Sequence, residues 1–407
     1  MKPSASPPNS PPSTALWSIV VFSFLAAAAS GVWLRYGFWS GFPADLIFVN
    51  VRHAHSHLMF YSWVTPAGML LLFHLLKHRG GETAGKWIVL VGVILGFLAF
   101  IPFMLSGYAS TPVGNIRLPL SMILSGFVVL SWWVFGLFYV LNSYKLKRDA
   151  TLFLVDVALA LLLFSSVGAF GLAIVANNAV PAGLLQALVD FFIGVFSEGW
   201  LVLLPLVFAL SRVAHNITPA VQRVLKVTAV IFGLSLPIRD GALVLKILDI
   251  NWLQPYAFTA QLLSGITLFV LAVITALSVQ KYSLKILPLL FIAVKGIIDM
   301  GLAFPDMVHW FDRNHLKVLM LHAYLLGAVS FSLFLAARQP TMYGAKSLPR
   351  PEWFLLGILA LLASLVLLTG YAPAFFPAAW LKATTIAGAA APLVGYALAK
   401  IPLRSGG

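Results

Sequence analysis

The feature that most constrains this chain is the series of long apolar stretches that recurs along it. A helix that spans a bilayer needs about 20 mostly apolar residues. Candidate spans fall near 15–34, 53–76, 87–107, 118–143, 151–176, 183–211, 218–245, 254–279, 284–303, 314–337, 353–371 and 376–399. Charged residues make up only 9% of the chain, whereas soluble domains carry roughly 25%. The sequence therefore predicts an all-α, polytopic integral membrane protein with about twelve transmembrane helices.

Basic residues indicate how these spans are oriented. Most of the 26 lysines and arginines lie in the even-numbered loops and near the two chain ends. Cytoplasmic loops carry the excess of Lys and Arg in membrane proteins. We therefore expect both termini in the cytoplasm and the protein in the inner (cytoplasmic) membrane. The net charge of +14 then reflects topology, and we expect the lipid bilayer and no nucleic acid as a partner.

The domain organisation is expected to be simple. Residues 1–14, MKPSASPPNSPPST, are rich in Pro and Ser and predict a disordered tail without an evident cleavable signal. Residues 15–400 predict a single transmembrane helical domain, with no internal repeat and no gap long enough for a soluble domain. The sequence contains no cysteine, which excludes disulfides, thiolate metal sites and thiol catalysis within this chain.

Histidines gather at the start of two predicted spans. His53, His55 and His57 alternate in VRHAHSHLMFYSW, at the start of the second span. On a helix, His53 and His57 share a face, whereas His55 points elsewhere. His315 and His322 lie in the first turns of the tenth span. Both spans begin on the outer side in the predicted topology, so these imidazoles lie at similar depths.

So many imidazoles near two helix starts predict a bound cofactor. A haem with two axial imidazoles, one on each face, suits electron transfer because both axial sites are closed. His322 with either His57 or His55 meets that need. Candidate partners for the haem propionates are Arg52, His309, His315 and Lys317. Copper, which imidazole also binds well, becomes the alternative if the second span begins irregularly and its three histidines converge.

Ionisable residues within the spans form a second candidate site. Glu198 lies in the sixth span, Arg239 and Asp240 in the seventh, and Lys295 and Asp299 in the ninth. The segment LSLPIRDG is expected to break the seventh span at its proline. A charge at the bilayer centre costs at least about 2.5–3.5 kcal/mol. These residues therefore either neutralise one another or line a proton or ion pathway, and a pathway would indicate a transporter without a cofactor.

Three short segments resemble a known family. HAHSHLMFYSW, MLHAYLLGAVS and VFSEGWLVLLPL are similar to segments of helices 2, 10 and 6 in subunit I of the haem-copper oxidases, a superfamily that includes the large subunit of nitric oxide reductase. The resemblance implies an oxidase-like bundle in which His57 (or His55) and His322 ligate a low-spin haem, expected to be b-type. It also implies electron transfer in a respiratory chain, with electrons from quinol, a small membrane subunit or an electron-donor subunit.

The chain departs from that family where the second metal would bind. Gly194 stands one turn before Glu198 where the family has a histidine, and FGLSLPIRDGALV contains none. Met320 replaces the first histidine of the tenth-helix His-x-His motif. The centre that reduces dioxygen or nitric oxide is therefore not expected here, and the resemblance is to a divergent relative that keeps one haem or none. A copper- or haem-containing protein of nitric-oxide tolerance and a cofactor-free transporter are the alternatives.

Overall fold

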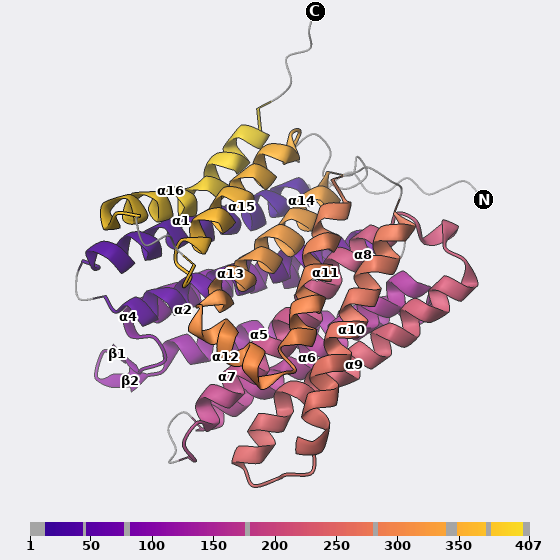
Figure 1. The fold of residues 1–407 in the computed structure, drawn as a ribbon, viewed down its shortest axis with the longest axis horizontal. Coiled ribbons are helices and arrows are strands. Elements are labelled where there is room, and N and C mark those ends of the chain that lie inside the picture. The colour runs from indigo at the N-terminus through magenta and orange to yellow at the C-terminus, as the bar shows by residue number, and fades with distance from the viewer. Residues whose placement is uncertain are drawn as a thin grey trace, which may run out of the picture.

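The structure, a computed structural model, is a bundle of helices (Figure 1) and describes residues 13–43, 46–76, 82–175, 180–279, 284–338, 348–371 and 376–401. The first half holds α1 (Ser13–Ser40), α2 (Phe48–Leu58), η1 (Met59–Val64), α3 (Thr65–Leu75), α4 (Glu82–Ser106), β1 (Thr111–Val113), β2 (Ile116–Leu118), α5 (Leu120–Ser143), α6 (Ala150–Val175), α7 (Leu184–Gly194), η3 (Val195–Leu201) and α8 (Val202–Leu210). The second half holds η4 (Ala214–Asn216), α9 (Pro219–Ile247), α10 (Gln254–Ser278), α11 (Ile286–Gly301), α12 (Pro305–Arg313), α13 (Leu316–His322), η5 (Ala323–Ser330), α14 (Phe331–Ala337), α15 (Pro351–Val366) and α16 (Ala378–Ala399).

The lengths and composition of these helices confirm an all-α polytopic membrane protein. Within the described residues, nine helical runs are long and apolar enough to cross a membrane, or ten if α11 and α12 form one bent span. Each of the twelve ranges predicted from the sequence contains helix, but the number of crossings and the side of the termini stay predictions. The expected tail at 1–14 lies almost wholly outside the described residues, and α1 already begins at Ser13.

Three helices of the bundle contain a π-helical segment in their middle. The segment η1 joins α2 to α3, η3 joins α7 to α8, and η5 joins α13 to α14. Nearly all of their side chains are buried. A π-helical segment widens the turn by one residue and occurs frequently at functional sites. These three helices carry His55, Glu198 and His322, so the distortions coincide with the helices that bear both candidate sites.

The π-helical segments contact one another at the centre of the bundle. Trp63 of η1 donates a hydrogen bond from Nε1 to Ser330 Oγ of η5 at 3.0 Å. Tyr324 of η5 donates from its hydroxyl to Ser197 Oγ of η3 at 3.0 Å. Phe60 of η1 meets the ring of Phe196 of η3 edge-on, with centroids 5.3 Å apart. Because these bonds are buried, they fix the rotation of the three helices relative to one another.

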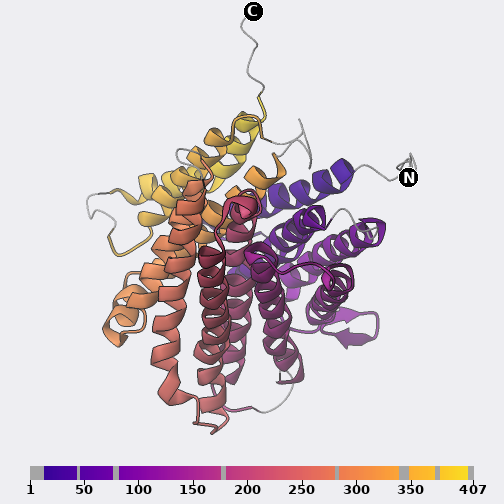
Figure 2. The same ribbon diagram turned by 90° about the vertical axis from the view of Figure 1, so that its right-hand side faces the viewer.

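Helices from the two ends of the chain close the bundle on one side. α1, α15 and α16 lie side by side (Figure 1). Aromatic rings join them to the central helices, with Phe24 of α1 meeting Trp63, Phe334 and Phe354 at centroid distances of 5.2, 5.4 and 5.5 Å. Figure 2 shows that the long helices beyond α1, α15 and α16 run next to one another. Figure 1 labels the most closely joined of these, α9, α10 and α11.

Three local features differ from the sequence predictions. The connection before α5 contains a two-stranded antiparallel hairpin, β1–β2, and the connection after α11 contains the short helix α12, bent by 118° from α11. Neither was expected. The predicted break of the seventh span was wrong, because α9 continues through Pro237 without interruption. A proline is tolerated in a transmembrane helix when neighbouring groups satisfy the freed backbone carbonyl.

Candidate functional site

Of the three histidines of α2, His55 faces α1, whereas His53 and His57 face elsewhere. Its Nδ1 lies 3.0 Å from the carbonyl oxygen of Ala27 and 3.0 Å from Ser30 Oγ. A carbonyl oxygen can only accept, so Nδ1 carries the hydrogen and Nε2 keeps a lone pair. The ring lies over Gly31, where an added Cβ would come within 3.0 Å of His55 Cε1. A glycine at this position of α1 therefore leaves the space that the imidazole fills.

His57 and His53 face α4 on the opposite side of α2. His57 donates from Nδ1 to the carbonyl oxygen of His53 at 2.7 Å, and its ring stacks on Phe103 with centroids 3.8 Å apart. The ring of Tyr108 lies 5.0 Å from His53 and 6.2 Å from His57. His57 is thus packed within an aromatic cluster. The sequence prediction that these two share a face and that His55 diverges agrees with this geometry.

His322 ends α13 and lies near His55. It donates from Nδ1 to the carbonyl oxygen of Val318 at 2.8 Å, so its Nε2 also keeps a lone pair. The imidazoles of His55 and His322 are close enough to interact electrostatically, and Arg35 of α1 is within the same range of His322. The structure thus places one histidine of α2 and one of α13 within electrostatic range of each other.

The helix around His322 is loosely packed. No residue of α13 is buried, whereas every residue of α14, further along the same helix, is buried. Met320 is also partly exposed. A helix inside a bundle normally buries the stripe that faces its neighbours. α13 is therefore less enclosed by its neighbours than α14, although Leu319 and Leu321 pack against the core.

The remaining predicted propionate partners are spread over the surface at this end of the bundle. Arg52, His309 and His315 are exposed, and Lys317 pairs with Asp312 at 2.9 Å. His315 is not in the first turn of the tenth span, as expected, but precedes α13 with φ of 54°. Arg35 was missed by the sequence reasoning, although its place near the end of the first apolar stretch was visible in the sequence.

The three histidines of α2 do not converge. α2 is an α-helix from Phe48 to Leu58, so its start is regular and His55 points away from His53 and His57. In the part of the chain that the structure describes, no group of three or more His, Cys, Asp or Glu side chains could hold a metal ion. The condition stated for the three-histidine copper site is therefore not met by the described residues.

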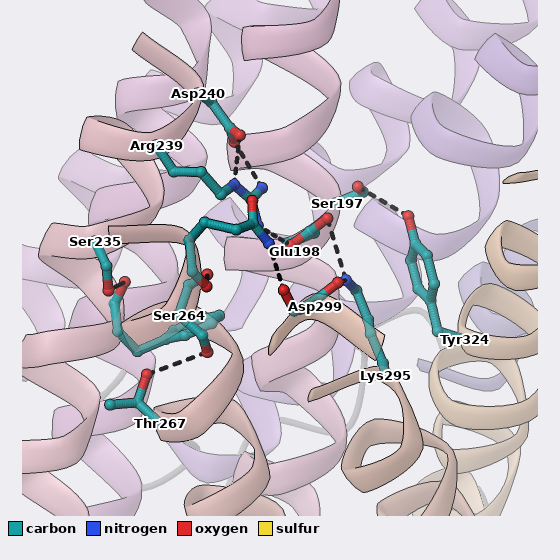
Figure 3. A network of polar contacts seen from close by, with 12 residues as sticks. Ser197, Glu198, Ser235, Arg239, Asp240, Ser264, Thr267, Lys295, Asp299 and Tyr324 are labelled. Carbon is teal, nitrogen blue, oxygen red and sulfur yellow. Dashed lines mark hydrogen bonds and ion pairs between the residues drawn. The ribbon is translucent and has the colours of Figure 1, made fainter. Parts of the chain in front are cut away.

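The five ionisable residues predicted within the spans form one cluster (Figure 3). Glu198 of η3 bridges two cations, accepting from Arg239 NH1 at 2.8 Å and from Lys295 Nζ at 3.1 Å. Arg239 also donates from Nε and NH2 to the two oxygens of Asp240, at 2.6 and 2.9 Å. Lys295 donates to both oxygens of Asp299, at 2.9 and 2.7 Å. The Arg239–Asp240 and Lys295–Asp299 pairs are thus joined through Glu198.

The cluster is enclosed by helices on several sides. The side chains of Lys295 and Asp299 are 3% and 7% exposed, and Tyr324 of η5 lies with its ring 5.3 Å from Lys295 Nζ. Gln261 of α10 donates to the backbone carbonyl of Asp299 at 2.8 Å. Such charges are retained at depth only when their partners compensate for lost hydration. The arrangement can hold charge and protons, and it joins η3, α9 and α11.

Gly194 lies directly against this cluster. A Cβ added to Gly194 would come within 2.3 Å of Asp240 Oδ2. The side-chain space beside Gly194, where the resembled family has a metal-binding histidine, is therefore filled by the Asp240 carboxylate. Arg239 and Asp240 belong to the segment of α9 that lacks histidine. The described residues thus put an ion cluster, rather than imidazoles, at this point of the bundle.

No protein-family model matches the chain, and a search of curated proteins finds no significant match. What the fold and sites define is a polytopic α-helical membrane protein with a pair of neighbouring imidazoles and a buried ion cluster.

Proposed function

We propose that the protein is a haem-binding membrane protein that transfers electrons through a low-spin haem held by His55 and His322. The observation that carries the proposal is that these two imidazoles lie on different helices within electrostatic range of each other, each with Nδ1 bound to a carbonyl. Metal-ligating histidines almost always donate their other ring hydrogen in this way, which fixes the tautomer and raises the basicity of the ligating nitrogen.

Two features near these histidines support the proposal. The absence of buried residues in α13 is consistent with a large planar group beside this helix. Arg35, near His322, offers a positive charge for a propionate. A bis-imidazole haem supplies one-electron transfer with both axial positions closed. The carbonyl groups of Ala27 and Val318 orient the imidazoles, and Arg35 would compensate the charge of a propionate.

The resemblance to haem-copper oxidase subunit I supports the same proposal, with the alternative His55 in place of His57, which the sequence reading named first. The glycine at position 194 and the ion cluster beside it support a relative without the second metal. We expect a b-type haem, location in the inner membrane, and electrons from quinol or from a partner subunit. These statements rest on the short similar segments and on the predicted topology.

The test is an optical spectrum of the detergent-purified protein, oxidised and dithionite-reduced, with and without carbon monoxide. We expect a low-spin haem spectrum that carbon monoxide does not shift. His55→Ala and His322→Ala should each abolish this spectrum, because each removes one axial ligand. His57→Phe is the matched control, since it keeps the stacking on Phe103 and should keep the haem.

Each contrary result has a definite meaning. A protein without haem, or an unchanged spectrum in His322→Ala, would overturn the proposal. Loss of haem in His57→Phe with retention in His55→Ala would move the ligand to His57. A shift with carbon monoxide would show an open axial site and a different ligand set.

The buried ion cluster favours a second candidate, a proton- or ion-coupled transporter without cofactor. Intramembrane charges mark ion routes in many transporters, and Glu198, Arg239 and Lys295 join three helices here. Metal analysis separates the two candidates. A protein without iron or copper that moves protons or ions across proteoliposome membranes would support the transporter.

A further inference from the structure

The ion cluster has an odd number of charges. Its members alternate in sign in the order Asp240, Arg239, Glu198, Lys295 and Asp299. Three carboxylates therefore face two cations. If every carboxyl group were ionised, the cluster would carry one uncompensated negative charge among side chains that are at most 17% exposed.

No other described charge offsets this excess. On the elements packed around the cluster, Asp190 of α7 is exposed and bound to Gln186 at 2.8 Å, and Asp156 of α6 pairs with Arg148 at 2.8 Å. The other charged side chains of α9 are Arg223 and Lys246, which are exposed, and Lys226, which donates to the Arg148 carbonyl. α8 and α10 contain no charged residue. Tyr324 contributes a neutral hydroxyl that donates to Ser197.

We propose that the cluster binds one exchangeable proton, shared between Asp240 and Asp299. An uncompensated buried charge costs several kcal/mol even after relaxation, and a carboxyl group avoids this cost by taking up a proton. Glu198 touches both cations and keeps its charge. Asp240 and Asp299 are the two outermost members of the cluster and each contact one cation, so these two carboxylates accept the proton. The proton belongs to the group of carboxylates rather than to a fixed residue.

A metal cation is a poorer fit than a proton. Each of the six carboxylate oxygens already accepts a hydrogen bond or ion pair from Arg239 or Lys295. A sodium ion would require several oxygens turned toward one point, and the two cationic side chains stand between them. A proton removes the excess charge at a single carboxylate oxygen. This conclusion holds with or without a haem at His55 and His322.

The proposal makes a counting prediction for infrared spectroscopy of the purified full chain in H₂O and D₂O. At neutral pH the wild-type protein should show one buried protonated carboxyl group, identified by the downshift of its C=O stretch on deuteration. Asp240→Asn, Asp299→Asn and Glu198→Gln each remove one carboxylate and leave two opposite pairs. Each should therefore abolish this band. Lys295→Met removes one cation and should raise the band about twofold, to two protonated carboxyl groups.

Asp190→Asn is the control, since it removes an exposed carboxylate outside the cluster and should leave the band unchanged. The proposal fails if the wild-type protein shows no such band, or if the band survives all three carboxylate substitutions. If the band is absent and sodium raises the thermal stability of the protein, a bound cation rather than a proton neutralises the cluster. Use of three carboxylate variants keeps the test decisive if one of them does not fold.

Discussion

Gly194 shows at the scale of one residue how closely the ion cluster is fitted to its helices. It ends α7 at the point where the π-helical segment η3 begins. The carboxylate of Asp240 fills the space above its Cα atom, and that carboxylate in turn holds Arg239. A side chain at position 194 therefore competes directly with a buried ion pair.

Gly194→Ala should lower the stability of the folded protein. The added Cβ would meet Asp240 Oδ2 at 2.3 Å, so the carboxylate must move away from Arg239. Overpacking of this kind costs about 1–3 kcal/mol. Thermal unfolding in detergent, followed by size-exclusion chromatography, measures the effect. Gly126→Ala is the control, because a Cβ at this position meets nothing within 4 Å. Alanine is also a better helix former than glycine, so this variant should not lose stability.

The sequence predicted which residues form the candidate sites better than it predicted which residues they contact. Their place in apolar stretches put Glu198, Arg239 and Lys295 within the predicted spans, and the cost of buried charge gave mutual neutralisation as one of two interpretations. It did not predict that Glu198 bridges two pairs, because this depends on the rotation of α9 and α11 about their axes. Arg35 was missed for a similar reason, since its proximity to His322 depends on how α1 packs.

At the scale of elements, the contact between α10 and α11 depends on two glycines. A Cβ on Gly265 would lie 2.6 Å from the backbone nitrogen of Met300, and one on Gly296 would lie 2.7 Å from the backbone nitrogen of Phe269. Transmembrane helices approach this closely only through small residues. Lys295 directly precedes Gly296, so the close approach also sets the position of the lysine in the ion cluster.

Gly265→Val should separate α10 from α11 and displace Lys295 from Glu198. We expect a stability loss of about 1–3 kcal/mol from overpacking, together with a changed infrared band for the protonated carboxyl group. Gly126→Val introduces the same side chain at an open position of a helix and should change neither quantity. An unaltered melting temperature and band in Gly265→Val would contradict the close contact.

Composition predicted the long helices, but not the details of their hydrogen bonding. Apolar length alone located helix in all twelve predicted ranges. The π-helical segments η1, η3 and η5 left no signal, because a shift from i+4 to i+5 bonding changes neither hydropathy nor length. α12 was missed because nine residues with several charges do not resemble a span. Pro305 at its first turn was the available signal, since proline favours that position.

At the scale of the whole molecule, the hairpin β1–β2 and the connection between α5 and α6 lie at opposite ends of α5. The predicted topology puts the hairpin outside the cell and Lys147 inside. Because the sequence has no cysteine, single cysteines can be introduced without any background. Asn115→Cys should react with a membrane-impermeant maleimide in intact cells or right-side-out vesicles. Lys147→Cys should react only after permeabilisation, and the reverse pattern would invert the topology.

The unburied helix α13 has a consequence for the lifetime of the protein. A ligand that binds only the folded state adds RT ln(1 + [L]/Kd) to stability, about 4 kcal/mol at a thousandfold excess over Kd. A group bound beside α13 would cover side chains that the polypeptide alone leaves partly exposed. The chain without that group would open there first and be the preferred substrate of membrane proteases. Cellular abundance would then follow the supply of the bound group.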